Sequence, residues 1–343
     1  MRSNLRSILV VILAVALLAY FFRHADLRDV AAELARGRLD LLVAALGTTM
    51  LTYVLRAFRW RYMLESIGPA RLADAFRTTV IGFAASFLLP ARAGEFLRPY
   101  LMARRSGWSA TAGFATIILE RVLDMVTVLV LFAAFLLTFD PSAGSIDEGT
   151  FRALEVGGLV ATAAALGVLA VFFVLAGRPA AVRRLSGLIG RAMPTRVAQA
   201  LSRPLEMFVS GLAVVRQPRR FLVTMALSFP LWLCIAAGIW LASRAFSIEI
   251  PLMGSFLLMA ILVVGVAVPT PGAVGGYHEA FRVGATAFYS VSNERAVGAA
   301  IVLHAISFVP VTLLGIAFMM EEGLTFGRMR RLAREAGAEE GIR

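Results

Sequence analysis

The chain contains no lysine, a single cysteine and few charged residues for its length. Of its 343 residues only 16% are charged, whereas 59% are hydrophobic. A soluble domain has about a quarter of its residues charged and about half apolar. This composition excludes an ordinary soluble domain, a disordered segment and a secreted disulfide scaffold. The lone Cys234 lies in an apolar stretch and excludes an internal disulfide or a multi-cysteine metal cluster.

Because lysine is absent, every basic side chain is an arginine, and the net charge is +12. Arginine binds phosphate through a planar, bidentate fork, whereas lysine acts as a point charge. High positive charge is also typical of nucleic-acid binding. Here the arginines gather mostly in short loops between apolar runs, as the positive-inside bias of membrane proteins requires. We therefore expect a membrane protein with no nucleic-acid partner.

Long apolar runs divide the chain into about eight segments. They cover roughly residues 7–22, 39–64, 73–90, 110–139, 152–176, 221–246, 252–268 and 296–320. A spanning helix needs about 20 apolar residues. The first run follows two arginines and precedes no small-residue cleavage site, so we expect a retained anchor. The pattern predicts an all-α polytopic membrane protein with one domain, 1–320, and a short cytoplasmic tail, 321–343.

Two of the runs end in breaks rich in proline and glycine. The first break contains Pro90 and Gly94, and the second contains Pro271, Gly272, Gly275 and Gly276. Proline interrupts a helix because it lacks the backbone donor and clashes with the preceding turn. Broken backbone survives at membrane depth only where protein or a water-filled cavity satisfies its polar groups. We therefore predict two re-entrant helical hairpins beside about six crossing helices.

The distribution of arginine favours this topology. Eight straight spans divide the arginines almost evenly between the two sides of the membrane. Six crossings with two hairpins place most of them in the cytoplasm, together with both termini and the loop 177–220. In that loop arginines alternate with leucine and isoleucine, which predicts amphipathic helices on the anionic inner leaflet. A topology anchor without a role toward substrate is the plainer alternative.

In this topology the two hairpins enter from opposite faces, and a weak internal similarity accompanies them. Residues 115–120 (ATIILE) resemble residues 299–304 (AAIVLH), and each stretch follows its break by a comparable distance. Paired, interrupted segments in halves of opposite orientation are the signature of inverted-repeat transporters. In this alignment His304 is the counterpart of Glu120.

Ionisable residues inside apolar segments are the best candidates for a substrate pathway, because charge is costly in a bilayer. Glu120, Arg121 and Asp124 lie within the run 110–139. A spacing of four residues places both acids on one helix face. Two acids in an apolar environment suit a proton relay. A structural ion pair that locks this helix to a neighbour is the alternative.

The first break adds Arg92, Glu95 and Arg98 around Gly94. Freed N–H groups at a helix N-terminus attract an anion. We therefore expect Arg92 and Arg98 to form a fork for a phosphate, with Glu95 setting their orientation. The alternative is an internal salt bridge that only holds the hairpin together.

The remaining candidates carry less specific signals. Glu279 follows the second break, and His304 is a lone membrane histidine, which is more commonly a packing residue. Arg56 and Arg59 lie beside Trp60 near the end of a run, as in an interfacial belt, where arginines can contact lipid phosphate. Motifs for nucleotide binding, zinc proteolysis or serine hydrolysis are absent in the required context. We therefore expect no cofactor, no metal and no catalytic residue.

These motifs resemble the transmembrane region of the lysylphosphatidylglycerol synthase/flippase family. The resemblance is carried by residues 56–60 (RAFRW), 89–98 (LPARAGEFLR), 115–124 (ATIILERVLD) and 269–276 (PTPGAVGG). It covers about residues 40–320. It implies a protein of the bacterial inner (plasma) membrane that moves a lipid between leaflets. Full-length relatives carry a cytosolic synthase domain after this region, and we expect a stand-alone member that performs no aminoacyl transfer.

The sequence therefore predicts a non-enzymatic translocase that flips or scrambles an anionic lipid, of phospholipid or polyprenyl-phosphate type. The head group is expected between the hairpins, in contact with Arg92, Arg98 and Arg121. Glu120 and Asp124 then change protonation as the halves move, with passive exchange as the alternative. Two other functions stay open. One is a non-catalytic subunit that assists a partner synthase or glycosyltransferase, and the other is a membrane enzyme acting on polyprenyl phosphate. Membrane lipids are the expected partners, and the oligomeric state stays open.

Overall fold

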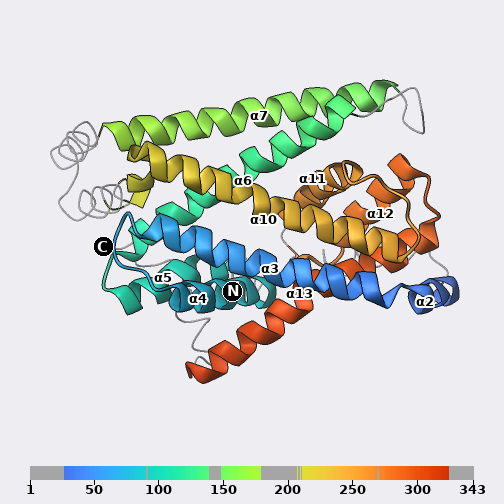
Figure 1. The fold of residues 1–343 in the computed structure, drawn as a ribbon, viewed down its shortest axis with the longest axis horizontal. Coiled ribbons are helices and arrows are strands. Elements are labelled where there is room, and N and C mark those ends of the chain that lie inside the picture. Colours follow the sequence, from blue (N-terminus) through green and yellow to red (C-terminus); the bar gives the residue numbers. More distant parts are fainter. Residues whose placement is uncertain are drawn as a thin grey trace, which may run out of the picture.

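The computed structural model describes residues 27–89, 92–138, 148–178, 207, 209, 211–268 and 270–323, and every regular element in these ranges is a helix (Figure 1). Five of these helices are long and apolar enough to cross a membrane. They are α3 (Leu39–Leu64), α6 (Ala110–Thr138), α7 (Glu148–Gly177), α10 (Pro218–Ala245) and α13 (Asn293–Glu321). The chain is therefore an all-α polytopic membrane protein, as predicted. The predicted anchor 7–22, most of the loop 177–220 and most of the tail 321–343 lie outside the described residues.

The two interrupted runs each form a pair of short helices. Hairpin 1 consists of α4 (Leu72–Leu88) and α5 (Gly94–Ser106), and hairpin 2 of α11 (Gly254–Ala267) and α12 (Gly276–Tyr289). At 1.5 Å per residue, α4 is about 26 Å long and α11 about 21 Å. The hydrocarbon core is about 30 Å thick. Both helices are therefore too short for a straight crossing, as the sequence predicts.

Each hairpin closes on a pair of glycines, one from each helix. A Cβ atom built on Gly94 lies 1.8 Å from the carbonyl oxygen of Gly82, and one built on Gly276 lies 2.5 Å from that of Gly265. Such distances leave no room for any side chain, so the helices approach this closely only because both positions are glycine. Gly94 and Gly276 each begin the second helix of their hairpin. The same packing device therefore recurs at the same place in both hairpins.

The helices α3 to α6 and α10 to α13 form two halves with the same order of elements: a long helix, a short pair and another long helix. The first helices of the halves, α3 and α10, pack along each other in opposite directions. The N–H of Arg38 at the start of α3 donates to the carbonyl of Ala245 at the end of α10, at 2.9 Å. Arg220 near the start of α10 donates to the carbonyl of Tyr62 near the end of α3, at 3.3 Å. This is the arrangement of an inverted repeat, as predicted.

The last helix of each half packs against the hairpin of the other half. α13 packs on α4, and α6 packs on α11. Figure 1 shows hairpin 1 towards one end of the long helices and hairpin 2 towards the other. The peripheral α7 packs on α6 and on η3 (Leu212–Arg216), while α2 (Leu27–Arg36) packs on α13. Exposed apolar side chains on α7, such as Leu159 and Val160, suit a surface in contact with lipid.

The tips of the two hairpins contact each other. The short η4 (Pro271–Ala273) of hairpin 2 packs against α4. Arg92, at the tip of hairpin 1, donates from Nη2 to the carbonyl of Val266 in the last turn of α11, at 2.5 Å. From the other side, His304 Nε2 lies 2.8 Å from the carbonyl oxygen of Gly272. Contacts of both halves therefore hold the tip of hairpin 2.

The turns at the tips use left-handed backbone. Gly272 and Gly275 have φ angles of 61° and 86°, which glycine adopts without steric cost. Arg92 adopts a φ of 51°, which is uncommon for a residue with a side chain. Pro90 lies outside the described residues, so its role stays a prediction. Pro271 begins η4, in agreement with the predicted break.

Candidate functional site

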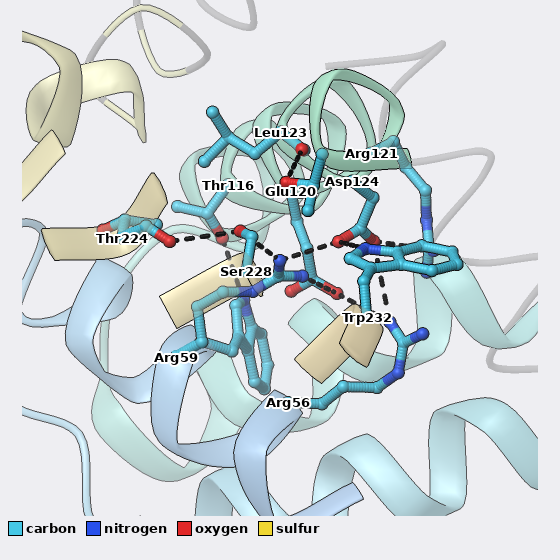
Figure 2. Close-up of polar contacts among 12 residues, drawn as sticks. Arg56, Arg59, Thr116, Glu120, Arg121, Leu123, Asp124, Thr224, Ser228 and Trp232 are labelled. Carbon is cyan, nitrogen blue, oxygen red and sulfur yellow. Dashed lines mark hydrogen bonds and ion pairs between the residues drawn. The ribbon is translucent and has the colours of Figure 1, made fainter. Parts of the chain in front are cut away.

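A buried network of charged side chains joins α3, α5 and α6. Figure 2 shows its contacts between α3 and α6. At its centre lie Arg59, Glu120 and Asp124, each at most 4% exposed. Arg59 donates from Nη1 to Asp124 Oδ1 at 2.7 Å, and its Nη2 lies 3.4 Å from Glu120 Oε1. One guanidinium therefore bridges both carboxylates. This confirms that the two acids share one face of α6.

Arg98 reaches the network from hairpin 1. Its Nη1 lies 3.2 Å from Glu120 Oε1, and its guanidinium carbon lies 3.9 Å from the ring centroid of Trp60. Trp60 in turn donates from Nε1 to Thr116 Oγ1 at 3.0 Å. The ion pair and the cation–π contact compensate for burying this arginine. The predicted interfacial position of Trp60 and Arg59 is wrong, because both side chains are fully buried between helices.

The helix α10 supplies two polar groups that sequence analysis did not single out. Ser228 Oγ accepts a hydrogen bond from Arg59 Nη1 at 2.7 Å, and Trp232 Nε1 donates to Asp124 Oδ1 at 2.9 Å. Figure 2 shows both side chains turned toward the network. Their spacing of four residues places them on one face of α10. In the sequence, this spacing is the one local sign that the two side chains act together. They contact the network because α10 packs on α3.

Arg56 and Arg121 form an outer layer of the network. Arg56 Nη1 lies 3.6 Å from Asp124 Oδ2 and 3.9 Å from Glu120 Oε1. Arg121 lies 3.5 Å from Asp124 Oδ2 through Nη1, and 3.5 Å from Glu95 Oε1 through Nε. Among the described residues, the buried Arg56 Nη1 and Arg121 Nε have no hydrogen-bond partner. Since buried donors are normally paired, the outer layer retains capacity for another acceptor.

The predicted arginine fork of hairpin 1 is wrong. Arg98 lies one turn inside α5 and is buried against α3, whereas Arg92 lies in the turn before that helix and bonds the carbonyl of Val266. Glu95 pairs with Arg121 of α6 and orients neither of the two arginines. The cause is the helix that begins between the two arginines, since it directs their side chains to different elements.

The candidates of the second half lie apart from this network. Glu279 pairs with Arg282 one turn further along α12. His304 bonds the carbonyl of Gly272, and its ring stacks on that of Phe308 with centroids 4.4 Å apart. These contacts fit the packing alternative for His304. In the second half the structure therefore gathers neutral and aromatic groups at the position where the first half gathers charges.

A cavity of about 380 Å³ lies beside the charged network. Its walls come from α3, α6, α10, α13 and the tips of both hairpins, and they are mostly apolar, with side chains such as Phe83, Met259 and Phe308. The charged residues on its surface are Arg56, Arg92, Arg121 and Asp124. The other members, such as Arg59 and Glu120, support this wall from behind. The volume is typical of a binding site for a small molecule or a head group.

The charged residues in and behind the cavity wall carry excess positive charge. There are five arginines, Arg56, Arg59, Arg92, Arg98 and Arg121, and three acids, Glu95, Glu120 and Asp124. Arginine keeps its charge in proteins, so the acids leave two positive charges without a counter-ion. A cavity with apolar walls and a cationic end suits an anionic amphiphile.

The carboxylates are arranged as counter-ions. Glu120 and Asp124 both face guanidinium groups, and no group of three or more His, Cys, Asp or Glu side chains in the described ranges is placed to hold a metal ion. The chemistry that the arrangement supports is reversible binding of an anion. The predicted exchange of protons by Glu120 and Asp124 stays a prediction.

Comparison with known proteins places the chain among relatives. The family model described as the lysylphosphatidylglycerol synthase TM region matches residues 7–315. The chain is also 27% identical over 336 residues to the glycosyltransferase AglD of Haloferax volcanii, a match that covers 91% of this chain and 53% of that protein. The chain thus spans about half the length of this curated relative. Since the family match covers the two halves, both hairpins and the charged network, the chain belongs to the lysylphosphatidylglycerol synthase transmembrane-region family.

Proposed function

We propose that this protein moves an anionic lipid, of phospholipid or polyprenyl-phosphate type, between the leaflets of the membrane. The observation that carries the proposal is the cavity between the hairpin tips, with apolar walls and an arginine-rich end. A lipid that changes leaflet must bring its charged head group through the hydrocarbon, where charge is costly. The cavity offers that head group cationic partners, while the acyl chains remain in the bilayer.

The head group contacts Arg56, Arg92 and Arg121 at the cavity wall. Beside them on the wall, Asp124 faces both Arg56 and Arg121 and is itself held from behind by Arg59. This buried support fixes the guanidinium groups before the lipid arrives. Preorganised partners replace hydration at a lower free-energy cost than groups that must first be ordered.

The inverted repeat supplies the movement. Two halves of opposite orientation that meet at half-depth can expose one site to each leaflet in turn, by rocking against each other. The contact from Arg92 to Val266 joins the halves at the hairpin tips and is the one that such a movement changes first. We propose no covalent step, catalytic residue or cofactor. A protonation change at Glu120 and Asp124 and passive exchange are alternative ways to drive the cycle.

We further propose that the protein lies in the bacterial plasma membrane with its termini in the cytoplasm. The ends of α3 and α5 and the start of α10 carry arginines, including Arg61, Arg104, Arg105, Arg219 and Arg220. The contact between Arg220 and Tyr62 places the start of α10 beside the end of α3. The positive-inside bias favours the cytoplasm for this end of the molecule.

The test is leaflet exchange by the purified protein in lipid vesicles. A fluorescent phosphatidylglycerol and a fluorescent phosphatidylcholine with the same tails are bleached from outside with dithionite. We expect the protein to accelerate exchange of the anionic lipid, and Arg56→Gln to slow it about tenfold, a loss of about 1.4 kcal/mol of interaction. Arg104→Gln, at an exposed site on α5, is the matched control and should leave the rate unchanged. Exchange no faster than in protein-free vesicles would contradict the proposal.

The similarity to a named glycosyltransferase favours a second candidate. In it, the same cavity presents a lipid-linked substrate to a partner synthase or glycosyltransferase. The vesicle assay separates the two functions. Exchange by the protein alone supports transport, whereas lipid binding without exchange supports the subunit. A chemically altered lipid in the vesicle extract indicates instead a membrane enzyme.

A further inference from the structure

We infer that the cavity is built for a phosphate monoester, a head group with two negative charges, in preference to a phosphodiester with one. The inference rests on the proposed function, because it names the class of head group that the same cavity takes. Three features of the arginines at the cavity wall support it. These are their number, the different elements from which they come, and their N–H donors that have no hydrogen-bond partner among the described residues.

The charges around the cavity do not balance. The five arginines in and behind the wall exceed the three acids by two charges. A phosphate monoester carries about −1.5 to −2 at pH 7, since its second pKa is about 6. A phosphodiester carries one negative charge and leaves one arginine without a counter-ion. Because a charge without a counter-ion is costly within a membrane, the monoester completes the site and the diester does not.

The arginines at the cavity wall also come from separate parts of the chain. Three guanidinium groups reach the cavity from three separate elements: Arg56 from α3, Arg92 from the tip of hairpin 1 and Arg121 from α6. A monoester presents three terminal oxygens, whereas a diester presents two. Arg56 is 7% exposed, and its Nη1 has no hydrogen-bond partner among the described residues. The cavity wall therefore carries as many guanidinium groups as a terminal phosphate has oxygens.

The nearby carboxylate of Asp124 does not prevent anion binding. Its Oδ1 already accepts hydrogen bonds from Arg59 Nη1 and Trp232 Nε1, and its Oδ2 faces Arg56 and Arg121. Asp124 therefore orders the two outer arginines while its own charge is compensated from behind. The guanidinium of Arg56 also lies 5.8 Å from the ring of Trp232, a cation–π contact that helps to fix it.

The apolar walls indicate that the phosphate belongs to a lipid. Beyond the arginines the cavity is lined by side chains such as Val128, Met259 and Leu262. A free phosphate ester gains nothing from these walls, whereas the glycerol or prenyl segment next to a lipid phosphate buries apolar surface against them.

The test compares lipids with identical tails on the intact, purified protein. Dioleoyl phosphatidic acid is the monoester, dioleoyl phosphatidylglycerol the diester and dioleoyl phosphatidylcholine the zwitterionic reference. Binding is measured at pH 8 and pH 5. At pH 8 we expect phosphatidic acid to bind about tenfold more tightly than phosphatidylglycerol. At pH 5 the monoester has lost most of its second charge, and the ratio should fall to about threefold or less.

The direction in which the ratio changes distinguishes titration of the lipid from titration of the protein. The charged or titratable groups that line the cavity are Arg56, Arg92, Arg121, Asp124, Tyr53, Tyr277 and Cys234. His278 and His304 lie behind the tip of hairpin 2. Any of these groups that titrates between pH 8 and pH 5 gains positive charge, which favours the more highly charged anion and would raise the ratio. A fall in the ratio therefore reports protonation of the lipid phosphate.

The possible results of these binding measurements have different consequences. Equal binding of the two anionic lipids at pH 8, both above phosphatidylcholine, overturns the monoester inference and leaves the proposed function intact. Binding of neither anionic lipid above phosphatidylcholine overturns both. Glycerol 3-phosphate should bind at least about a hundredfold more weakly than phosphatidic acid, and equal binding overturns the lipid assignment. Arg121→Gln should lower the ratio at pH 8, while Arg104→Gln should not.

Discussion

The two halves of the molecule share one architecture but differ in chemistry. Each half has a long helix, a glycine-paired hairpin and a second long helix. In the first half the hairpin and the following helix contribute a charged network around Glu120 and Asp124. In the second half the corresponding region holds His304, Tyr277 and Phe308, in aromatic contacts.

This difference distinguishes the residues that the fold requires from those that the binding site requires. The glycine pairs occur in both halves, so they belong to the architecture. The buried arginines and acids occur in one half, and the other half folds into the same elements without them. The charges are therefore not required to build a hairpin, and their desolvation is compensated only in part within the network. We attribute them to the binding of an anion.

The largest expected effect comes from breaking the charged network. Arg59→Gln leaves two buried carboxylates short of a partner and should lower the free energy of unfolding by about 3–5 kcal/mol. His304→Gln, in the corresponding region of the second half, should cost about 1 kcal/mol. Thermal unfolding in detergent measures both. Adding Asp124→Asn to Arg59→Gln should recover part of the loss, because it removes the unpaired charge. Equal costs in the two halves would refute the distinction between them.

A smaller loss of stability, equal in both halves, is expected when the hairpin glycines are replaced. Gly94→Ala and Gly276→Ala each place a methyl group against a backbone carbonyl and should cost about 1–3 kcal/mol. Gly157→Ala on α7 meets nothing within 4 Å and serves as the control, with little change in the melting temperature. If only one of the hairpin variants is destabilised, the two hairpins are not equivalent.

The smallest effect is expected at the contact between hairpin tips. Arg92→Met removes the hydrogen bond to Val266, worth about 0.5–1.5 kcal/mol, so amide hydrogen exchange at the end of α11 should accelerate by up to about tenfold. Tyr277→Phe removes only the 3.4 Å contact with Ser307 and should change exchange by less. Unaltered exchange in Arg92→Met would show that this contact does not hold the tips together.

The sequence predicts the helices well because their limits depend on local signals. The run 39–64 coincides with α3, and the run 252–268 contains α11 with a difference of two residues at one end and one at the other. Hydropathy defines the long helices, and proline and glycine define the breaks. The short lengths of α4 and α11 follow from the same signals. The hydropathy pattern and the two breaks together also indicate the inverted repeat.

The site is predicted less completely, because its geometry depends on how the helices are rotated. The sequence indicates Glu120, Asp124 and the arginines, since charge in an apolar run is conspicuous. It does not show that Trp60 faces the interior, because α3 is apolar on most sides and shows no clear polar face. Ser228 and Trp232 contact the network only through the packing of α10 on α3, which no local pattern specifies.

The most direct test of the account uses the chain's single cysteine, Cys234, which lines the cavity. The rate at which a small maleimide modifies this thiol is measured in micelles that contain either an anionic or a zwitterionic lipid with the same tails. If the head group binds at the arginine-rich end, the anionic lipid slows the modification strongly and Arg56→Gln abolishes that protection. Equal protection by both lipids, unchanged in Arg56→Gln, would contradict the claim that the cavity holds an anionic head group.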